Sequence, residues 1–213
     1  MSADGRLVSR AGTTGATADR GLHELGAGAV LLVPQRAAVP APLLVFLHGA
    51  GGSGAVSLHH VRSAAEAAGV LVLAPSSVGP TWDLLTGHLG PDVAALDAAL
   101  AQVFALHDVD RVALGGFSDG GSYALSLGLA NGDLLPDVIA FSPGFLAPPA
   151  QVGAPRVWVS HGTADTVLPV GRCGRRVVAQ LTGAGYDVTY EEFAGGHVVP
   201  AELVTAALTW WHG

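Results

Sequence analysis

The pentapeptide Gly116-Phe117-Ser118-Asp119-Gly120 has the residue types and spacing of a nucleophile presented on a tight turn. It follows an apolar segment, Arg111–Phe117, that we expect to be a strand, and it precedes a helix expected over Gly120–Ala130. A serine in this strand–turn–helix context has strained backbone angles and an exposed hydroxyl, so the flanking positions must be small. We therefore predict that Ser118 is a nucleophile, in preference to the alternative of an ordinary glycine-rich turn.

Two further candidates, Asp165 and His197, each follow a predicted strand. Asp165 comes after Arg156–Ser160, and His197 comes after Tyr186–Phe193. A serine hydroxyl needs a base within hydrogen-bond reach and a carboxylate that orients this base. Because the carboxyl ends of parallel strands meet at one edge of a sheet, residues that are distant in the chain can converge there. The sequence thus predicts a catalytic triad of Ser118, Asp165 and His197.

A second glycine-rich segment, His48–Gly54, directly follows the predicted strand Leu43–Leu47. Its glycines also match the spacing GxGxxG of dinucleotide-binding loops, but that motif needs an acidic residue at the end of the next strand. Here the next strand, Val70–Ala74, is followed by Pro-Ser-Ser. We therefore favour an oxyanion hole, with the N–H of Ala50 and the N–H of Asp119 as donors.

Apolar segments and helical patterns alternate along most of the chain, which predicts an α/β fold with a mainly parallel sheet. We expect one domain over residues 1–213, with an irregular lead-in at 1–28 that holds a short strand near Leu7–Ser9. The other expected strands are Ala29–Val33, Leu43–Leu47, Val70–Ala74, Arg111–Phe117, Val138–Ser142, Arg156–Ser160 and Tyr186–Phe193. The expected helices are Val56–Ala68, Asp92–His107, Gly120–Ala130, Val170–Gly183 and Ala201–Trp211.

Composition excludes several classes of protein. The 213 residues carry a net charge of −7, which argues against nucleic acid as a partner. All ten basic residues are arginine, so no lysine is present for a P-loop or a Schiff base. Cys173 is the only cysteine, and we expect it to be structural; we expect no metal and no cofactor. No apolar run is long enough for a membrane span and no signal peptide is evident, so we expect a cytoplasmic protein.

Four ordered blocks resemble the phospholipase/carboxylesterase branch of the α/β-hydrolases, which includes small bacterial carboxylesterases and acyl-protein thioesterases. The blocks are LVFLHGAGGSG, LGGFSDGGSYAL, VSHGTADTVLPV and FAGGHVVP, and the resemblance covers roughly residues 29–212. It implies an α/β-hydrolase fold with helices on both faces of the sheet and no lid domain. It also implies the same triad and oxyanion donors, and hydrolysis of carboxylic esters or thioesters without a cofactor.

One position departs from this branch, which often has glutamine where this chain has Asp119. A carboxylate beside a developing oxyanion repels it unless the side chain points away. At the first turn of a helix, the carboxylate can instead interact favourably with the helix dipole.

The sequence therefore predicts a serine carboxylesterase that acts on small-molecule esters with short acyl chains. Pro143–Pro155 joins the two strands between which a lid is inserted in many relatives, and it is too short and too rich in proline for a cap. The expected apolar walls of a shallow substrate site are Trp82, Leu168, Phe145 and Leu146. Alternatives are a thioesterase acting on acylated protein or acyl-CoA, a feruloyl-type esterase, and a catalytically silent ligand receptor.

Overall fold

The computed structural model describes residues 5–12, 19–86 and 90–212 of the chain. Within these residues, eight strands form one sheet in the order β1-β2-β4-β3-β5-β6-β7-β8. The strands are β1 (Gly21–Glu24), β2 (Val30–Val33), β3 (Ala41–Leu47), β4 (Leu71–Ala74), β5 (Val109–Phe117), β6 (Asp137–Phe141), β7 (Arg156–Gly162) and β8 (Val188–Phe193). The α-helices are α1 (Gly54–Ala68), α2 (Pro91–Leu106), α3 (Asp119–Ala130), α4 (Gly174–Gly183) and α5 (Ala201–His212).

The sheet is mainly parallel, as expected. β2 pairs antiparallel with both β1 and β4, whereas β4, β3, β5, β6, β7 and β8 pair in parallel with one another. The carboxyl ends of these parallel strands therefore lie along one edge of the sheet. In open α/β sheets this edge is where ligands bind.

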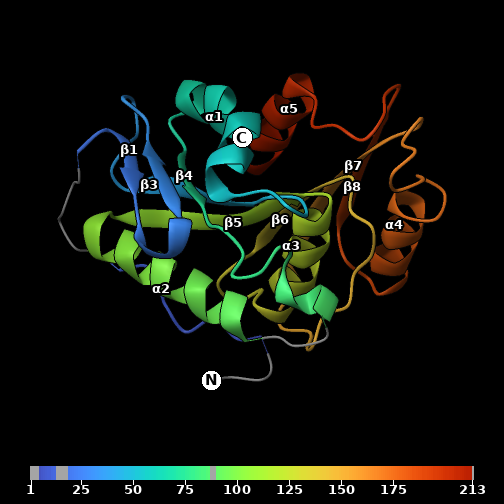
Figure 1. Cartoon of the computed structure of the whole chain (residues 1–213), viewed down its shortest axis with the longest axis horizontal. Coiled ribbons are helices and arrows are strands. Elements are labelled where there is room, and N and C mark those ends of the chain that lie inside the picture. The colour runs from blue at the N-terminus through green and yellow to red at the C-terminus, as the bar shows by residue number, and fades with distance from the viewer. Residues whose placement is uncertain (1–4, 13–18, 87–89, 213) are drawn as a thin grey trace.

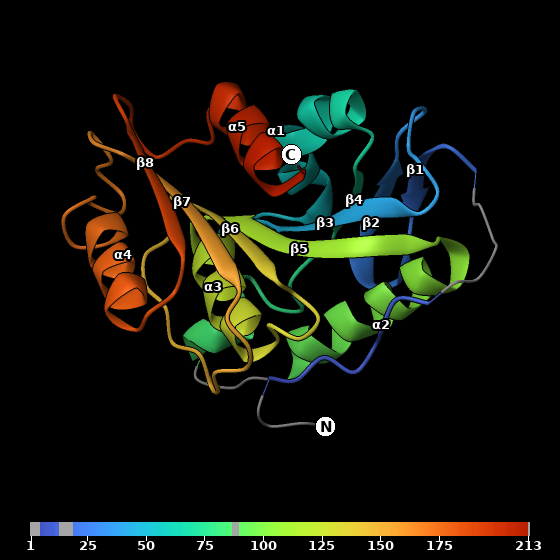
Figure 2. The ribbon, with the colours of Figure 1, turned by 180° about the vertical axis from the view of Figure 1, so that it is seen from behind.

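Helices cover both faces of the sheet (Figures 1 and 2). α1 and α5 pack on one face, and α2, α3 and α4 pack on the other. Successive strand residues point to opposite faces. In β3, Leu43 and Val45 enter the cluster beneath α2 and α3, while Leu44 and Phe46 enter the cluster beneath α1 and α5. A strand that is buried on both faces must be apolar throughout, which explains the unbroken apolar runs.

The expected lead-in at residues 1–28 needs a correction. β1 lies within it and extends the sheet by antiparallel pairing with β2. The strand expected near Leu7–Ser9 does not form. Residues 1–4 and 13–18 of the lead-in lie outside the described residues.

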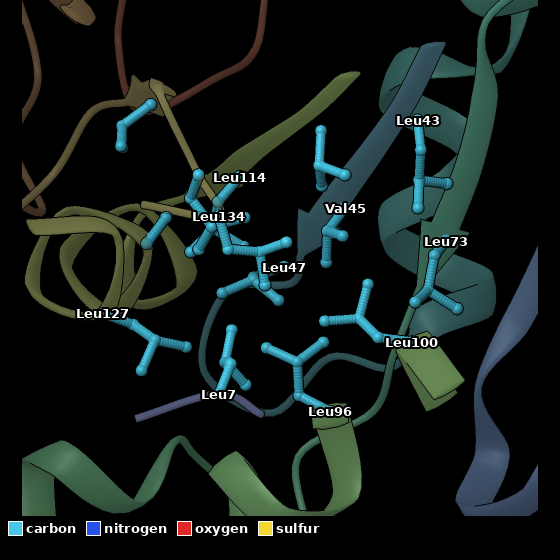
Figure 3. Packing of buried hydrophobic residues seen from close by; sticks show 14 of the residues in the cluster. Leu7, Leu43, Val45, Leu47, Leu73, Leu96, Leu100, Leu114, Leu127 and Leu134 are labelled. Carbon is cyan, nitrogen blue, oxygen red and sulfur yellow. The ribbon is translucent and has the colours of Figure 1, made fainter. Parts of the chain in front are cut away.

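Leu7 is nevertheless buried in the main core beside Leu96 (Figure 3). The backbone around it bonds to side chains instead of a neighbouring strand: Leu7 N donates to Asn131 Oδ1 at 2.8 Å, and Ser9 N donates to Asp97 Oδ1 at 2.9 Å. The strand prediction was wrong because the backbone N–H groups of this segment bond to side chains of Asn131 and Asp97, and not to the backbone of a neighbouring strand.

The expected helix at Val170–Gly183 begins four residues late, at Gly174. Cys173 precedes it with φ −114° and ψ −90°, which is not helical, and the residues before Cys173 form turns. The other predicted elements differ from the observed bounds by two residues at most. No helix in the described part of the chain is long and apolar enough to cross a membrane.

Candidate active site

Ser118 lies between the end of β5 and the start of α3, with φ 57° and ψ −116°. Such a conformation is strained for a residue with a side chain. A Cβ atom on Gly116 would lie 2.3 Å from the carbonyl oxygen of Gly120, and one on Gly120 would lie 2.4 Å from the carbonyl oxygen of His48. The tight turn therefore requires glycine at both flanking positions, as the sequence predicts.

The structure brings Ser118, His197 and Asp165 into one chain of hydrogen bonds. His197 Nε2 lies 2.8 Å from Ser118 Oγ, and His197 Nδ1 lies 2.6 Å from Asp165 Oδ2. The carboxylate accepts, so Nδ1 carries the proton and Nε2 is free to accept from the serine hydroxyl. A base that is oriented by a carboxylate and bonded to a hydroxyl is the arrangement that nucleophilic catalysis needs.

Close packing between the loops after β7 and β8 places the aspartate and the histidine. Thr163 N donates to Phe193 O, and Ala164 N donates to Gly195 O, both at 2.9 Å. A Cβ atom on Gly162 would lie 2.3 Å from the carbonyl oxygen of Gly196. The two loops can meet this closely only because Gly162 has no side chain.

The Asp165 side chain is fully buried, yet it is held in its charged form. Burial by itself raises a carboxyl pKa, but here hydrogen bonds outweigh it. Oδ1 accepts from the N–H groups of Leu168 (2.8 Å) and Val167 (2.9 Å), and Oδ2 accepts from His197. Together with the charge interaction with His197, these bonds lower the pKa of Asp165 below its usual value. The carboxylate is therefore ionised at neutral pH.

Two residues outside the predicted site support this arrangement. His161 is fully buried; its Nε2 lies 2.7 Å from Leu168 O and 3.3 Å from Asp165 Oδ2. The sequence analysis assigned it no role in the site, and its place at the end of β7, four residues before Asp165, is the signal that could have indicated one. The Phe117 ring lies 4.7 Å from the His197 ring, centroid to centroid, and supports one of its sides.

The predicted oxyanion donors lie beside Ser118. A Cβ atom on Gly49 would be 3.4 Å from the Ser118 Cβ, so the turn containing Ala50 packs directly on the serine. Gly51 N donates to Pro80 O and Gly52 N donates to Gly49 O, whereas the Ala50 N–H has no acceptor among the described residues. Asp119 opens α3, so its N–H has no acceptor inside the helix.

The Asp119 side chain is turned toward the loop that follows β4. Its Oδ2 accepts a hydrogen bond from the Thr81 hydroxyl and lies 3.4 Å from the backbone N of Trp82. Burial raises the pKa of Asp119 to about 6; the Trp82 N–H opposes this shift and the negative charge of Asp92 adds to it. Asp119, which stands where this branch often has glutamine, is thus a buried carboxylate whose hydrogen-bond partners are Thr81 and Trp82.

Three of the four predicted substrate walls lie at or beside the segment that follows β6, next to a cavity whose lining contains no residue of the predicted triad. Phe145 and Leu146 line a cavity of about 100 Å³, together with residues of α4. The Leu168 methyl groups would lie 3.5 Å from a Cβ atom on Gly144, the residue directly before Phe145.

A residue that the sequence analysis missed fixes this segment. Ser122, one turn after Ser118, accepts at its Oγ from Gly144 N (2.9 Å) and Phe145 N (3.4 Å).

Trp82 corrects the fourth expectation. Its side chain is 1% exposed and packs between the rings of His48 and Tyr123, at centroid distances of 4.8 and 5.1 Å. Its indole Nε1 donates to His48 O at 2.8 Å. Such a residue has almost no surface for a substrate. The loop position suggested an exposed wall, but burial of a large apolar ring decides the outcome.

A larger recess, of about 400 Å³, lies between α1 and α5 and contains none of the candidate residues. Among the described residues, no group of three or more histidine, cysteine, aspartate or glutamate side chains could hold a metal ion.

The fold and the site define the class. A mostly parallel eight-stranded sheet with helices on both faces, and a serine on a strained turn between β5 and α3, make this an α/β-hydrolase fold. Solved structures agree with this fold. Esterase PE8 superposes with a TM-score of 0.66, covering 90% of this chain and 98% of that chain at 24% identity. S-formylglutathione hydrolase (FrmB) from Staphylococcus aureus superposes with a TM-score of 0.72, covering 90% and 94% at 13% identity.

Within that class, the family model of the Phospholipase/Carboxylesterase family matches residues 95–210, which is more than half of the chain. The chain belongs to this family.

Curated relatives match over shorter stretches. A putative esterase, NocK, from Nocardia uniformis subsp. tsuyamanensis is 35% identical over 141 residues, or 60% of this chain and 41% of that protein. Acyl-protein thioesterase 1 from Gibberella zeae is 34% identical over 105 residues, or 44% of each chain. The matched part spans less than half the length of these two relatives.

Proposed function

We propose that this protein is a serine hydrolase that cleaves short-chain carboxylic esters through an acyl-enzyme. The observation that carries the proposal is the hydrogen-bonded chain from Asp165 through His197 to Ser118, at 2.6 and 2.8 Å, with the serine on a strained turn. Membership of the Phospholipase/Carboxylesterase family supports the same activity.

In the first half of the reaction, Ser118 Oγ bonds to the acyl carbon while its proton passes to His197 Nε2. The carbonyl electron pair moves onto the oxygen, which the N–H groups of Ala50 and Asp119 would stabilise. When the carbonyl re-forms, the bond to the alcohol oxygen breaks, and His197 gives its proton to the departing alcohol. The ionised Asp165 stabilises the imidazolium in between.

In the second half, water replaces the alcohol. His197 accepts a proton from the water molecule as its oxygen bonds to the acyl carbon. The bond to Ser118 Oγ then breaks, and the proton returns to the serine, which releases the carboxylic acid. His197 Nε2 must be unprotonated at the start of each half, because only then can it accept the proton from serine or water.

The substrate class follows from the shape of the site. Residues 142–155, between β6 and β7, contain no helix or strand, which supports a site without a cap. We assign the acyl group to Phe145 and Leu146, which line a cavity of about 100 Å³, and to Leu168, which packs beside the adjoining Gly144. Such a cavity would bury only a few methylene groups, each contributing about 0.8 kcal/mol.

A thioesterase is the second candidate, because the chain is 34% identical to an acyl-protein thioesterase over 105 residues. The same triad would attack a thioester, with a thiol leaving in place of an alcohol. A feruloyl-type esterase would need a deeper pocket for the aromatic acid. A silent receptor would need an incomplete triad.

We further infer that residues 1–213 act as one domain. Leu7 is buried in the core, and the Arg6 guanidinium bonds to Asp133, with a shortest distance of 2.7 Å, so the N-terminal segment is tied to the end of α3. The expected partner is a small-molecule ester.

One experiment tests the proposed function. The wild-type protein and Ser118→Ala are treated with a fluorophosphonate probe and then assayed on matched pairs of oxoesters and thioesters with the same acyl group. We expect stoichiometric labelling of the wild type at Ser118, no labelling of the variant, and faster turnover of the oxoesters. Absence of both labelling and ester turnover in the wild type would favour the receptor, and faster turnover of the thioesters would favour the thioesterase.

A further inference from the structure

We propose that the Asp119 carboxylate is a positioning residue that acts through Thr81 and Trp82 to hold the turn of residues 48–52, and with it the Ala50 N–H, against Ser118. This inference rests on the proposed function and identifies what fixes the oxyanion hole of the same site. It gives the unusual residue after the nucleophile a role.

The 48–52 turn is held from outside by the loop of residues 77–82, which follows β4. Three hydrogen bonds join the loop to the turn. They run from Ser77 N to His48 Nε2 (2.9 Å), from Gly51 N to Pro80 O (2.8 Å) and from Trp82 Nε1 to His48 O (2.8 Å). Gly51 N belongs to the peptide that follows Ala50, so its bond to Pro80 O holds the turn one peptide away from the Ala50 N–H. The orientation of the donor therefore depends on where the loop lies.

Asp119 ties this loop to the helix that begins after the nucleophile. The Thr81 hydroxyl donates to Asp119 Oδ2, and the Trp82 N–H points to the same oxygen from 3.4 Å. Thr81 follows Pro80 directly, so the anchor and the contact to Gly51 are one residue apart. The path from Asp119 through Thr81 and Pro80 to Gly51 is therefore short.

The packing leaves little freedom along this path. A Cβ atom on Gly120 would lie 2.4 Å from the carbonyl oxygens of Leu47 and His48, so α3 and the 48–52 turn are already in close contact. The Trp82 ring fills the space between His48 and Tyr123. If the 77–82 loop shifts, the 48–52 turn must therefore move with it, because little free space lies between them.

The anchoring role needs an acceptor oxygen on residue 119, and a negative charge on that oxygen strengthens the anchor to a small extent. Hydrogen bonds to a carboxylate are stronger than those to a neutral acceptor, and the first turn of a helix favours a negative charge. The charged group that acts on Asp119 is Asp92, which accepts from the N–H groups of Val78 and Asp83 and interacts in turn with Asp83 and His48; His48 Nε2 accepts from Ser77 N. Asp92 and Asp83 are carboxylates, and His48 accepts a hydrogen bond at Nε2, so none of them supplies a positive charge to Asp119. The Thr81 and Trp82 donors are thus the direct compensation for the Asp119 carboxylate.

The kinetic consequence is specific. Oxyanion donors act on the transition state more than on the bound substrate, so a displaced Ala50 N–H lowers kcat and leaves KM nearly unchanged. Loss of a whole donor costs about 10²–10³ in kcat, and displacement of one costs less. We expect kcat to fall about 10- to 100-fold when the carboxylate is removed.

The test compares the wild type with Asp119→Ala, Asp119→Asn, Thr81→Val and the double variant Asp119→Ala/Thr81→Val. Thr205→Val, which removes an exposed hydroxyl on α5, is the control for loss of a threonine hydroxyl. Each protein is assayed for kcat and KM on one short-chain ester. Hydrogen exchange is measured for peptides that cover residues 48–52 and 77–82.

We expect Asp119→Ala to lose 10- to 100-fold in kcat at constant KM and to exchange faster in both segments. Thr81→Val should lose about tenfold, and the double variant should be no worse than Asp119→Ala, because both changes break one link. Asp119→Asn keeps an acceptor oxygen and should stay within about threefold of the wild type. The Thr205→Val control should match the wild type.

Three outcomes would overturn the inference: unchanged kcat in Asp119→Ala, multiplicative losses in the double variant, or unchanged exchange at residues 48–52. If Asp119→Ala does not fold, Thr81→Val still decides, because the carboxylate remains in place. A wild type that turns over no ester would refute the proposed function instead. The exchange measurement would still judge the link between Asp119 and the turn.

Discussion

Two buried aspartates lie near Ser118, and their surroundings move their pKa values in opposite directions. Asp165 accepts from two backbone N–H groups and from His197, and its pKa is below the usual value. Asp119 accepts from the Thr81 hydroxyl with Trp82 N at 3.4 Å, and burial raises its pKa to about 6. Both residues are buried, 5% and 8% exposed; at Asp165 the hydrogen bonds and the charge of His197 outweigh burial, whereas at Asp119 burial and the Asp92 charge outweigh a single backbone donor.

This contrast separates two uses of one residue type. In its proposed role Asp165 stabilises an imidazolium and has to remain charged, and the N–H groups of Val167 and Leu168, together with His197, favour the charged form. A carboxylate that only anchors a loop can tolerate a raised pKa. In the sequence each aspartate simply follows a predicted strand, and only the tertiary structure shows the hydrogen-bond donors and charges that distinguish them.

The largest expected effect comes from removing the proposed nucleophile, Ser118, which lies near both aspartates. Ser118→Ala should lower kcat by about 10⁴-fold or more while the melting temperature stays close to that of the wild type. Steady-state kinetics and thermal unfolding check this. More than one tenth of wild-type activity in the variant would remove Ser118 from its proposed role.

The next effect compares the two carboxylates directly. Asp165→Asn should lower kcat by about 10³–10⁴-fold because it removes the charge that stabilises protonated His197. Asp119→Asn should change kcat by less than about threefold, since the amide oxygen still accepts.

Asp137→Asn is the matched control, because Asp137 pairs with Arg156 at the opposite edge of the sheet and should be kinetically silent. Equal losses at Asp165 and Asp119 would erase the distinction between them.

Stability against pH provides a third comparison. The folded-state pKa of Asp119, about 6, lies above its ordinary value of 3.8, so the folded protein binds this proton more tightly than the unfolded chain. The wild type should therefore lose stability at this group as the pH rises from 4 to 6, by about 2 kcal/mol between pH 4.5 and 7.5. Asp119→Asn should lack this component.

Urea unfolding of the wild type and of Asp119→Asn at pH 4.5 and 7.5 measures this change in the free energy of unfolding. For Asp165 the sign is reversed, because a lowered pKa contributes stability that is present above the unfolded-state value and is lost as the pH falls. A wild-type curve that parallels that of Asp119→Asn would show that burial does not perturb Asp119.

His161→Phe should have a smaller effect on the side of Asp165. The ring still fills the buried space, but the bond from Nε2 to Leu168 O is lost, and the backbone that donates to Asp165 loosens. We expect kcat to fall about tenfold, in line with the loss of one hydrogen bond to a positioned loop. An effect as large as that of Asp165→Asn would instead give the imidazole a direct role in the chemistry.

The smallest expected changes in kcat/KM come from lengthening the acyl chain of the substrate. Each methylene buried against Leu168, Phe145 and Leu146 should add about 0.8 kcal/mol, or about fourfold in kcat/KM, until the cavity is full. We expect kcat/KM to be best at about two to six acyl carbons among p-nitrophenyl esters from acetate to palmitate. A maximum at about ten carbons or longer, or a jump in rate above the critical micelle concentration, would reveal an acyl tunnel and a lid.

Much of the fold could be predicted from the sequence because its signals are local. Apolar runs of strand length, separated by amphipathic segments of helix length, determine an α/β sheet with both faces covered. The N-terminal segment could not be predicted in this way. Leu7 N bonds to Asn131, which is 124 residues away, and no local pattern encodes such a contact.

For the site, the sequence by itself determined the positions of Ser118, Asp165 and His197, because each follows a strand and parallel strands end at one edge of the sheet. Only the tertiary structure decided what surrounds them. Trp82 is buried as a support for the 48–52 turn, and the carboxylate of Asp119 meets a hydroxyl 38 residues away. The physical reason is the sequence distance over which each property is set. The local pattern of a strand determines that the next residue lies at its carboxyl end, whereas burial and hydrogen-bond partners depend on which distant loops pack against that residue.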